Sequence, residues 1–117
     1  MKFRYIYDFA FDLVDFSCQR EFKFKRSVKM CEGIFLDFDE KGMPVALEMI
    51  GASKILHVHR KHLMEQDIEV HVEVTRELIK TEIKVGYFLT HGKSEVNIKN
   101  EIPNEYLMPS VDVVITR

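Results

Sequence analysis

Hydrophobic and polar positions alternate along most of the chain with the period of two that extended strands require. Within residues 3–11 every odd position is aromatic, whereas the even positions include charged side chains. The alternation places five aromatic rings on one side of an extended segment, and we expect a tight reversal of the chain around residues 8–12. We expect the aromatics of the first half, Phe9 and Phe35 among them, to form much of the core.

A β-hairpin is predicted between residues 33 and 50, where two apolar runs flank the turn-forming segment 39–42. An aspartate in that segment can accept hydrogen bonds from backbone N–H groups, and Gly42 supplies a positive φ without strain. Pro44 lacks an N–H group, so we expect it at the start of a strand or on a sheet edge.

The second half of the chain begins with a predicted helix and then returns to strand periodicity. Ser53 belongs to a residue type that caps helices, and a buried stripe follows it: Ile55, Leu56, Leu63 and Met64. These residues predict one short helix near residues 54–65. Alternation then predicts strands within residues 68–74, 79–89, 96–102 and 111–115. The fold class is therefore mainly β, α+β at most, with antiparallel β-meanders or hairpins.

The length of 117 residues predicts a single domain, 1–117, made of a first half, 1–56, and a second half, 57–117. Hydrophobic residues at 46% and charged residues at 31% are typical of a globular domain. No apolar run approaches the roughly 18 residues that cross a bilayer, and acidic residues interrupt the N-terminus before a signal-like stretch can form. We therefore expect a cytoplasmic protein that does not contact a membrane.

The charge balance and the cysteines exclude two further classes of protein. A formal net charge of −2 argues against a strongly basic nucleic-acid binder. Cys18 and Cys31 are too few for a disulfide framework, so we expect both thiols to be reduced and partly buried.

Two motifs in the first half carry a resemblance to a known family. The segment 7–14 is similar to the opening Tyr-Asp…Asp…Leu pattern of the family catalogued as domain of unknown function 2283. Residues 36–42 and 47–53 resemble its Asp-x-Asp-x-x-Gly hairpin and its Ala-Ser ending. The similarity covers residues 3–56, and the second half resembles the β-rich extension of longer, mainly archaeal members.

This resemblance implies a small β-meander and no established activity. Some relatives are encoded beside toxin-like partners, which implies an antitoxin-like role with a toxin-like protein as the partner.

Carboxylates form the first candidate site: Asp8, Asp12, Asp37 and Asp39. Asp37 and Asp39 share one side of a strand, and the predicted reversal would bring Asp8 or Asp12 near them. Clustered carboxylates bind hard cations or share a proton in acid–base chemistry. The structural alternative is that Asp12 and Asp39 cap turns while Asp37 faces solvent.

Three histidines form the second candidate site in the pattern His57-x-His59-x-x-His62. Imidazoles at such spacing can ligate Zn²⁺, with Cys18 or Cys31 as a fourth ligand. No single helix or strand geometry aligns all three rings, so surface histidines near a helix start are the alternative.

Basic and aromatic side chains alternate in a further predicted strand, residues 20–29, with Phe22 and Phe24 on one face. Single-stranded nucleic-acid platforms combine cations with stacking rings in this way. The alternative is a half-buried strand with a solvated basic face. The side chains that would contact a partner are Arg20, Lys23, Lys25, Arg26 and Lys29.

Glu48 lies inside the apolar run of the predicted hairpin and must find a partner there. We expect a cross-strand ion pair with Arg4, Lys23 or Lys25, and the alternative is a contact with a binding partner.

These patterns together predict a protein with no catalytic residues and no cofactor, and nucleic acid is not its expected partner. The most consistent function is a non-catalytic protein–protein interaction or structural module. Because many strands in a short chain leave exposed edges, we expect a homodimer. We expect its interface to bury a strand face or edge from residues 68–89 or 110–116.

Overall fold

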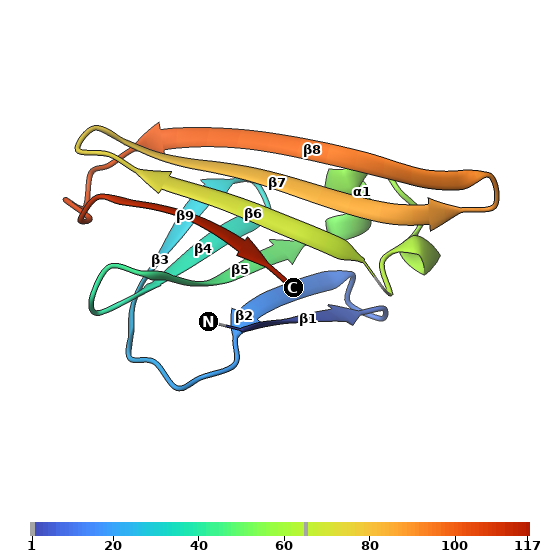
Figure 1. The fold of residues 1–117 in the computed structure, drawn as a ribbon, viewed down its shortest axis with the longest axis horizontal. Helices are drawn as coiled ribbons and strands as arrows, with labels where there is room; N and C mark the ends of the chain where they lie inside the picture. The colour runs from blue at the N-terminus through green and yellow to red at the C-terminus, as the bar shows by residue number, and fades with distance from the viewer. Residues whose placement is uncertain (1, 65) are drawn as a thin grey trace.

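The structure is a computed structural model that describes residues 2–64 and 66–117, and it confirms the mainly β fold. Two antiparallel sheets pack against each other with the short helical segments at one end (Figure 1). The first sheet has the strand order β1-β2-β5-β4-β3 and the second has the order β8-β7-β6-β9. The first sheet consists of β1 (Phe3–Asp8), β2 (Leu13–Cys18), β3 (Phe24–Cys31), β4 (Ile34–Asp39) and β5 (Pro44–Ile50).

The second sheet is built from the second half of the chain. It consists of β6 (Asp67–Val74), β7 (Leu78–Leu89), β8 (Gly92–Pro103) and β9 (Val111–Thr116). The α-helix α1 (Ala52–Leu56) and the 3₁₀ turn η1 (Arg60–His62) connect the two sheets. No helix in the described parts of the chain is long and apolar enough to cross a membrane.

One continuous core fills the space between the sheets, because the inward-facing positions of both are apolar. The largest fully buried side chains of the first sheet are Phe16, Phe38, Ile34, Leu36, Leu47 and Met49, and those of the second are Ile79 and Ile83. The two halves of the sequence therefore form two layers around one common core.

The hairpin predicted between residues 33 and 50 is present as β4 and β5. Asp39 Oδ1 accepts hydrogen bonds from the backbone N–H groups of Lys41 and Met43, each 2.9 Å long. Gly42 has a φ of 82°, and Pro44 is the first residue of β5, as expected. A Cβ atom on Gly42 would overlap the ring of Pro109, a contact that the local pattern does not reveal.

The extended segment predicted from the N-terminal alternation is wrong beyond residue 8. β1 ends at Asp8, and the turn that follows leaves Phe9 50% and Phe11 79% exposed. The turn ends at Asp12, whose φ is 55° and whose carboxylate is buried, so the backbone no longer follows the strand period. Phe35 was also misassigned, because it is only partly buried and lies on the side of β4 opposite the buried Ile34 and Leu36.

The strand predicted over residues 20–29 begins four residues later and ends at Cys31. β3 begins at Phe24, whose ring is 59% exposed, and its buried residues are Val28 and Met30. Its pairing with β4 shifts between Phe24 and Arg26, so the simple alternation breaks there.

The predicted helix over residues 54–65 is two short segments instead. The residue before α1 is Gly51, and Ser53 is not the N-cap but donates its hydroxyl to Asp12. His57 has a φ of 55° and ends the helix. Met64 is 52% exposed, so it does not belong to a buried stripe.

The apolar face of residues 68–74 is covered within the chain, whereas that of residues 111–115 is covered only in part. β6 pairs with β9, which places Val70 opposite Ile115, and Val72 is completely buried against the core. The apolar face of β6 is therefore part of the core and not an exposed surface.

Candidate binding surfaces

Asp12 is the most constrained polar side chain in the first half of the chain. Its carboxylate accepts a 2.6 Å hydrogen bond from the Tyr7 hydroxyl, a 2.6 Å bond from the Ser53 hydroxyl and a 3.0 Å bond from the Ser53 backbone N–H. The Arg60 guanidinium lies 4.0 Å away. Burial alone would raise the pKa of Asp12, but the bonds from Ser53 and Tyr7 and the charge of Arg60 lower it below its ordinary value.

This cluster is structural, because its groups are satisfied by one another. Burial and the bond to Asp12 raise the pKa of the Tyr7 hydroxyl, so Tyr7 stays a neutral donor. The backbone carbonyl of Asp12 also accepts bonds from Gly51 and Ala52. Asp12 therefore ties the first turn to the start of α1 rather than capping its own turn.

The outer face of the first sheet carries carboxylates side by side. Asp15 on β2 lies directly opposite Glu48 on β5, and Glu48 in turn lies opposite Phe35 on β4. The row ends in Ile6 on β1, opposite Asp15, and in Lys29 on β3, opposite Phe35. Like charges directly opposite each other destabilise a sheet, so this arrangement is unfavourable in the free chain.

Glu48 lacks the ion pair that the sequence predicted for it. Among the described residues, no lysine, arginine or histidine lies within 4.0 Å of its carboxylate, and Lys29 pairs with Glu32 instead. Burial, Asp37 and Asp15 together raise the pKa of Glu48 above its ordinary value of 4.5. The expected pair with Arg4, Lys23 or Lys25 was wrong, and among the described residues neither Glu48 nor Asp15 has a cation within 4.0 Å.

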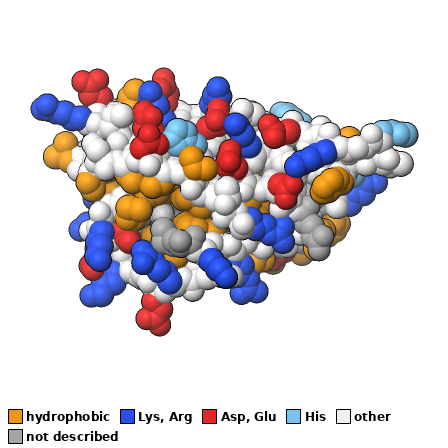
Figure 2. All heavy atoms as spheres, viewed as in Figure 1, with side chains coloured by type: hydrophobic (Ala, Val, Ile, Leu, Met, Phe, Trp, Pro, Cys, Tyr) orange, Lys and Arg blue, Asp and Glu red, His pale blue; other side chains and the backbone are white. Residues whose placement is uncertain are grey.

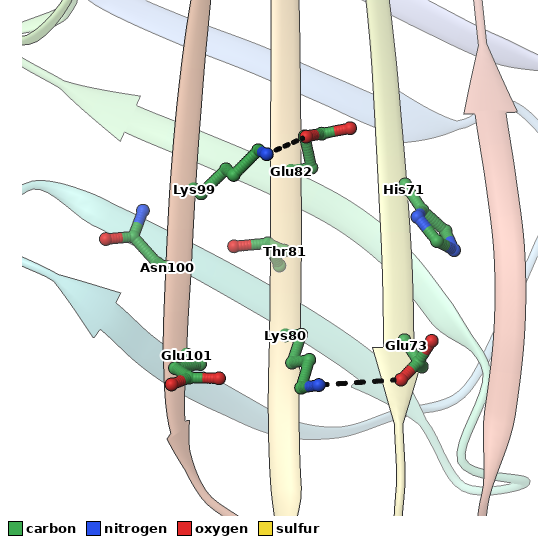
Figure 3. A pocket seen from close by; sticks show the side chains of 8 residues that line it. All are labelled: His71, Glu73, Lys80, Thr81, Glu82, Lys99, Asn100 and Glu101. Atoms are coloured by element: carbon green, nitrogen blue, oxygen red, sulfur yellow. Dashed lines mark ion pairs between the residues drawn. The ribbon is translucent and has the colours of Figure 1, made fainter.

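The outer face of the second sheet is also charged, but its charges are balanced. Figure 3 shows Lys99 on β8 reaching to Glu82 on β7, at 3.2 Å, and Lys80 on β7 reaching to Glu73 on β6, at 3.9 Å. These residues line a shallow hollow, and Figure 2 shows acidic and basic side chains intermingled over this part of the surface. Opposite charges at neighbouring positions make this face a solvated sheet surface.

His71, Glu73 and Asp112 are the only residues of the described chain whose possible metal ligands form a group, within 4.8 Å of one another. His71 Nε2 lies 2.6 Å from Asp112 Oδ1, and Glu73 lies directly opposite Asp112. One imidazole and two carboxylates can hold a transition metal. His71 already contacts Asp112, and the Lys80 ammonium lies 3.9 Å from Glu73.

The candidate metal ligands taken from the sequence are not brought together. Asp39 holds the β4–β5 turn, and Asp37 lies on β4, paired in register with Ala46. His57 and His59 are exposed at helix ends. His62 packs against Tyr87 with the rings tilted and 5.8 Å between their centres.

The basic strand forms a sheet edge, because β3 is the last strand of the first sheet. Arg20 and Lys23 precede β3, while Lys25, Arg26 and Lys29 belong to it. The Arg26 guanidinium lies 4.2 Å from the centre of the Tyr106 ring, so this cation is already engaged within the chain.

Sequence reasoning missed both carboxylate pairings, Asp15 with Glu48 and Glu73 with Asp112. The alternation already placed His71 and Glu73 on one face of a strand. The partner strand and its register come only from the tertiary structure, because β6 and β9 are separated by two strands of sequence.

No family model, no curated protein and no solved structure matches this chain.

Proposed function

We propose that this chain is a non-catalytic interaction module that binds a protein partner on the outer face of its first sheet. The observation that carries the proposal is the pair Asp15 and Glu48, two neighbouring carboxylates with no cation beside them among the described residues. A segment that presents a lysine or arginine between apolar side chains has the chemistry that complements this face.

Apolar side chains around the carboxylates support a protein partner rather than a free ion. Ile6 and Ile50 are exposed to 43% and 53%, and Phe35 lies directly opposite Glu48. A partner that covers these side chains gains from their burial, and its cation removes the repulsion between Asp15 and Glu48. Surfaces that cost stability in the free protein are typical of binding sites.

An amphipathic peptide of alternating leucine and lysine tests this surface. In an NMR titration of the labelled protein, we expect shifts confined to backbone amides of the first sheet around Asp15, Glu48 and Phe35. Glu48→Lys should abolish them. Glu77→Lys, the same charge reversal in the exposed β6–β7 turn, should leave them unchanged. Equal binding by both variants, or shifts spread over both sheets, would contradict the proposal.

The resemblance of residues 3–56 to domain of unknown function 2283 remains part of this proposal. A toxin-like protein with a basic apolar segment is then one candidate partner. Two free cysteines agree with a cytoplasmic location.

A nucleic-acid role for the basic strand is the second candidate. The exposed ring of Phe24 beside Lys25 favours it, whereas the Arg26–Tyr106 stack and the net charge disfavour it.

We also propose that the chain forms a homodimer.

A further inference from the structure

The strand β8 (Gly92–Pro103) is an unusually long sheet edge. It has twelve residues, pairs with β7 along its full length without a register shift, and has no strand on its other side among the described residues. An edge strand leaves every second backbone N–H and C=O group unpaired, and a long regular edge invites a further strand. The edge of β8 is therefore a candidate interface.

The outward-facing side chains of β8 are complementary to themselves. Along the strand they read Lys93, Glu95, Asn97, Lys99 and Glu101. If a second copy of β8 pairs antiparallel about Asn97, then Lys93 lies opposite Glu101 and Glu95 lies opposite Lys99. The two-fold axis repeats both pairs, so four opposite-charge pairs form around one Asn97–Asn97 contact.

The inward-facing side chains of β8 also match one another in this register. Val96 would lie opposite Ile98, and Ser94 would lie opposite Asn100, so apolar groups meet apolar groups and polar groups meet polar ones. Val96 and Ile98 are only partly buried in the single chain, although they pack against the core. A second β8 would remove more of their surface from water.

In a single chain, two of the four charged side chains on this edge have no ion-pair partner among the described residues. Lys93 binds Asp67 at 2.9 Å and Lys99 binds Glu82 at 3.2 Å, but Glu95 and Glu101 have no cation within 4.0 Å among the described residues. Dimerisation would give both carboxylates a lysine from the second copy.

The neighbouring edge has the opposite character. β3 ends the first sheet on the same side of the molecule, but its pairing is broken between Phe24 and Arg26 and again between Lys29 and Cys31. Its exposed lysines and these irregularities are devices that prevent strand pairing. β1 and β9, the other edges, have six residues each, half the length of β8.

We propose that two copies of this chain join through antiparallel pairing of their β8 strands, centred on Asn97, into one continuous eight-stranded sheet. The inference rests on the proposed homodimer and specifies its strand and register. It does not depend on a partner binding to the first sheet, so the peptide titration with Glu48→Lys tests that function separately.

Cysteine cross-linking tests the register. Directly opposite residues of an antiparallel pair have Cα atoms about 4.5–5.5 Å apart, within the range of a disulfide. We expect Asn97→Cys to form a covalent dimer on mild oxidation. Lys99→Cys alone should not, because the two copies of residue 99 would be about 13 Å apart along the strands. Mixing Lys99→Cys with Glu95→Cys should give the mixed dimer, and the wild type, with Cys18 and Cys31, is the blank.

Charge reversal tests the interface without requiring a new bond. Lys99→Glu and Glu95→Lys should each weaken the dimer by about tenfold, because each places like charges opposite each other twice. An equimolar mixture of the two variants should restore the dimer in sedimentation equilibrium, since each lysine then faces a glutamate. This rescue also shows that both variants are folded.

Two results would overturn the inference in different ways. A wild type that sediments as a monomer at the highest soluble concentration would remove the dimer altogether. A wild-type dimer that neither cross-links through Asn97→Cys nor responds to the two charge reversals would exclude β8 and assign the interface to another edge, such as β1 or β9.

Discussion

The hydroxyl of Ser53 donates a 2.6 Å hydrogen bond to Oδ2 of Asp12, a residue 41 positions earlier in the chain. Asp12 is only 3% exposed, and its carboxylate also accepts a hydrogen bond from the Tyr7 hydroxyl. A single buried side chain thus connects the β1–β2 turn to the start of α1.

Replacing Asp12 should therefore destabilise the fold more than a surface change does. We expect Asp12→Ala to lower the free energy of unfolding by about 2–4 kcal/mol, because it leaves buried donors without an acceptor and places alanine at a positive φ. Ser53→Ala should cost about 1 kcal/mol, because the backbone N–H of residue 53 keeps its bond to Asp12. Urea denaturation measures both, and equal losses for the two variants would contradict the geometry.

Substitutions at Gly42 and Gly51 should distinguish the cost of backbone strain from the cost of steric overlap. Both have positive φ, 82° and 74°, but a Cβ on Gly51 would meet nothing within 4 Å, whereas one on Gly42 would overlap Pro109. We expect Gly51→Ala to cost about 1–2 kcal/mol from its backbone alone. Gly42→Ala should cost more, and Gly42→Val more still, in thermal denaturation. If Gly42→Ala costs no more than Gly51→Ala, Pro109 moves aside without penalty.

The aromatic side chains should divide according to burial rather than according to the sequence pattern. Phe16→Ala or Phe38→Ala should cost about 3–5 kcal/mol, because both rings are almost completely buried. Phe11→Ala, at a ring that is 79% exposed, should stay within about 0.5 kcal/mol. Similar losses for Phe11 and Phe16 would mean that the turn after β1 is wrongly placed.

Stability should depend on pH through Glu48. Its pKa is raised in the folded chain above the ordinary value of 4.5, so the folded state holds this proton more tightly than the unfolded state does. The contribution of Glu48 is therefore most favourable below pH 4.5 and is lost as the pH rises through the folded pKa. Glu48→Gln should be more stable than the wild type at pH 7, by about 0.5 kcal/mol, and this difference should shrink towards pH 4.5.

Asp12 acts in the opposite direction at lower pH. Its pKa is lowered below the ordinary value of 3.8, so its contribution is present above pH 3.8 and is lost as the pH falls through the folded pKa. Chemical denaturation over a pH series should separate the two groups. A Glu48→Gln advantage that does not change with pH would contradict the assignment to Glu48.

Metal removal should leave the protein unchanged. The three side chains already have partners, His71 with Asp112 and Glu73 with Lys80, so we expect a chelator to leave the thermal midpoint where it was. A metal centre would instead be identified if the chelator lowers the midpoint and Zn²⁺ restores it. This response should then be lost in His71→Ala and kept in His59→Ala.

The sequence by itself determined the β class, the β4–β5 hairpin and most strand positions of the second half. These features depend on contacts between near neighbours in the chain. The Gly42 turn and the period-two alternation of residues 68–74 are encoded locally, because each residue's face follows from the pleat alone. Sequence reasoning failed where a distant group overrides the local pattern, as Ser53 does at Asp12.

Only the tertiary structure decided how the strands pair beyond the β4–β5 hairpin. The order β1-β2-β5-β4-β3 places Asp15 beside Glu48, and the pairing of β6 with β9 places Glu73 beside Asp112. Neither adjacency can be read from spacing, because strands far apart in sequence pair according to how both sheets bury one common core. The same packing leaves β8 as a free edge, so the outward pattern of Lys93 to Glu101 acquires meaning only once that edge is known.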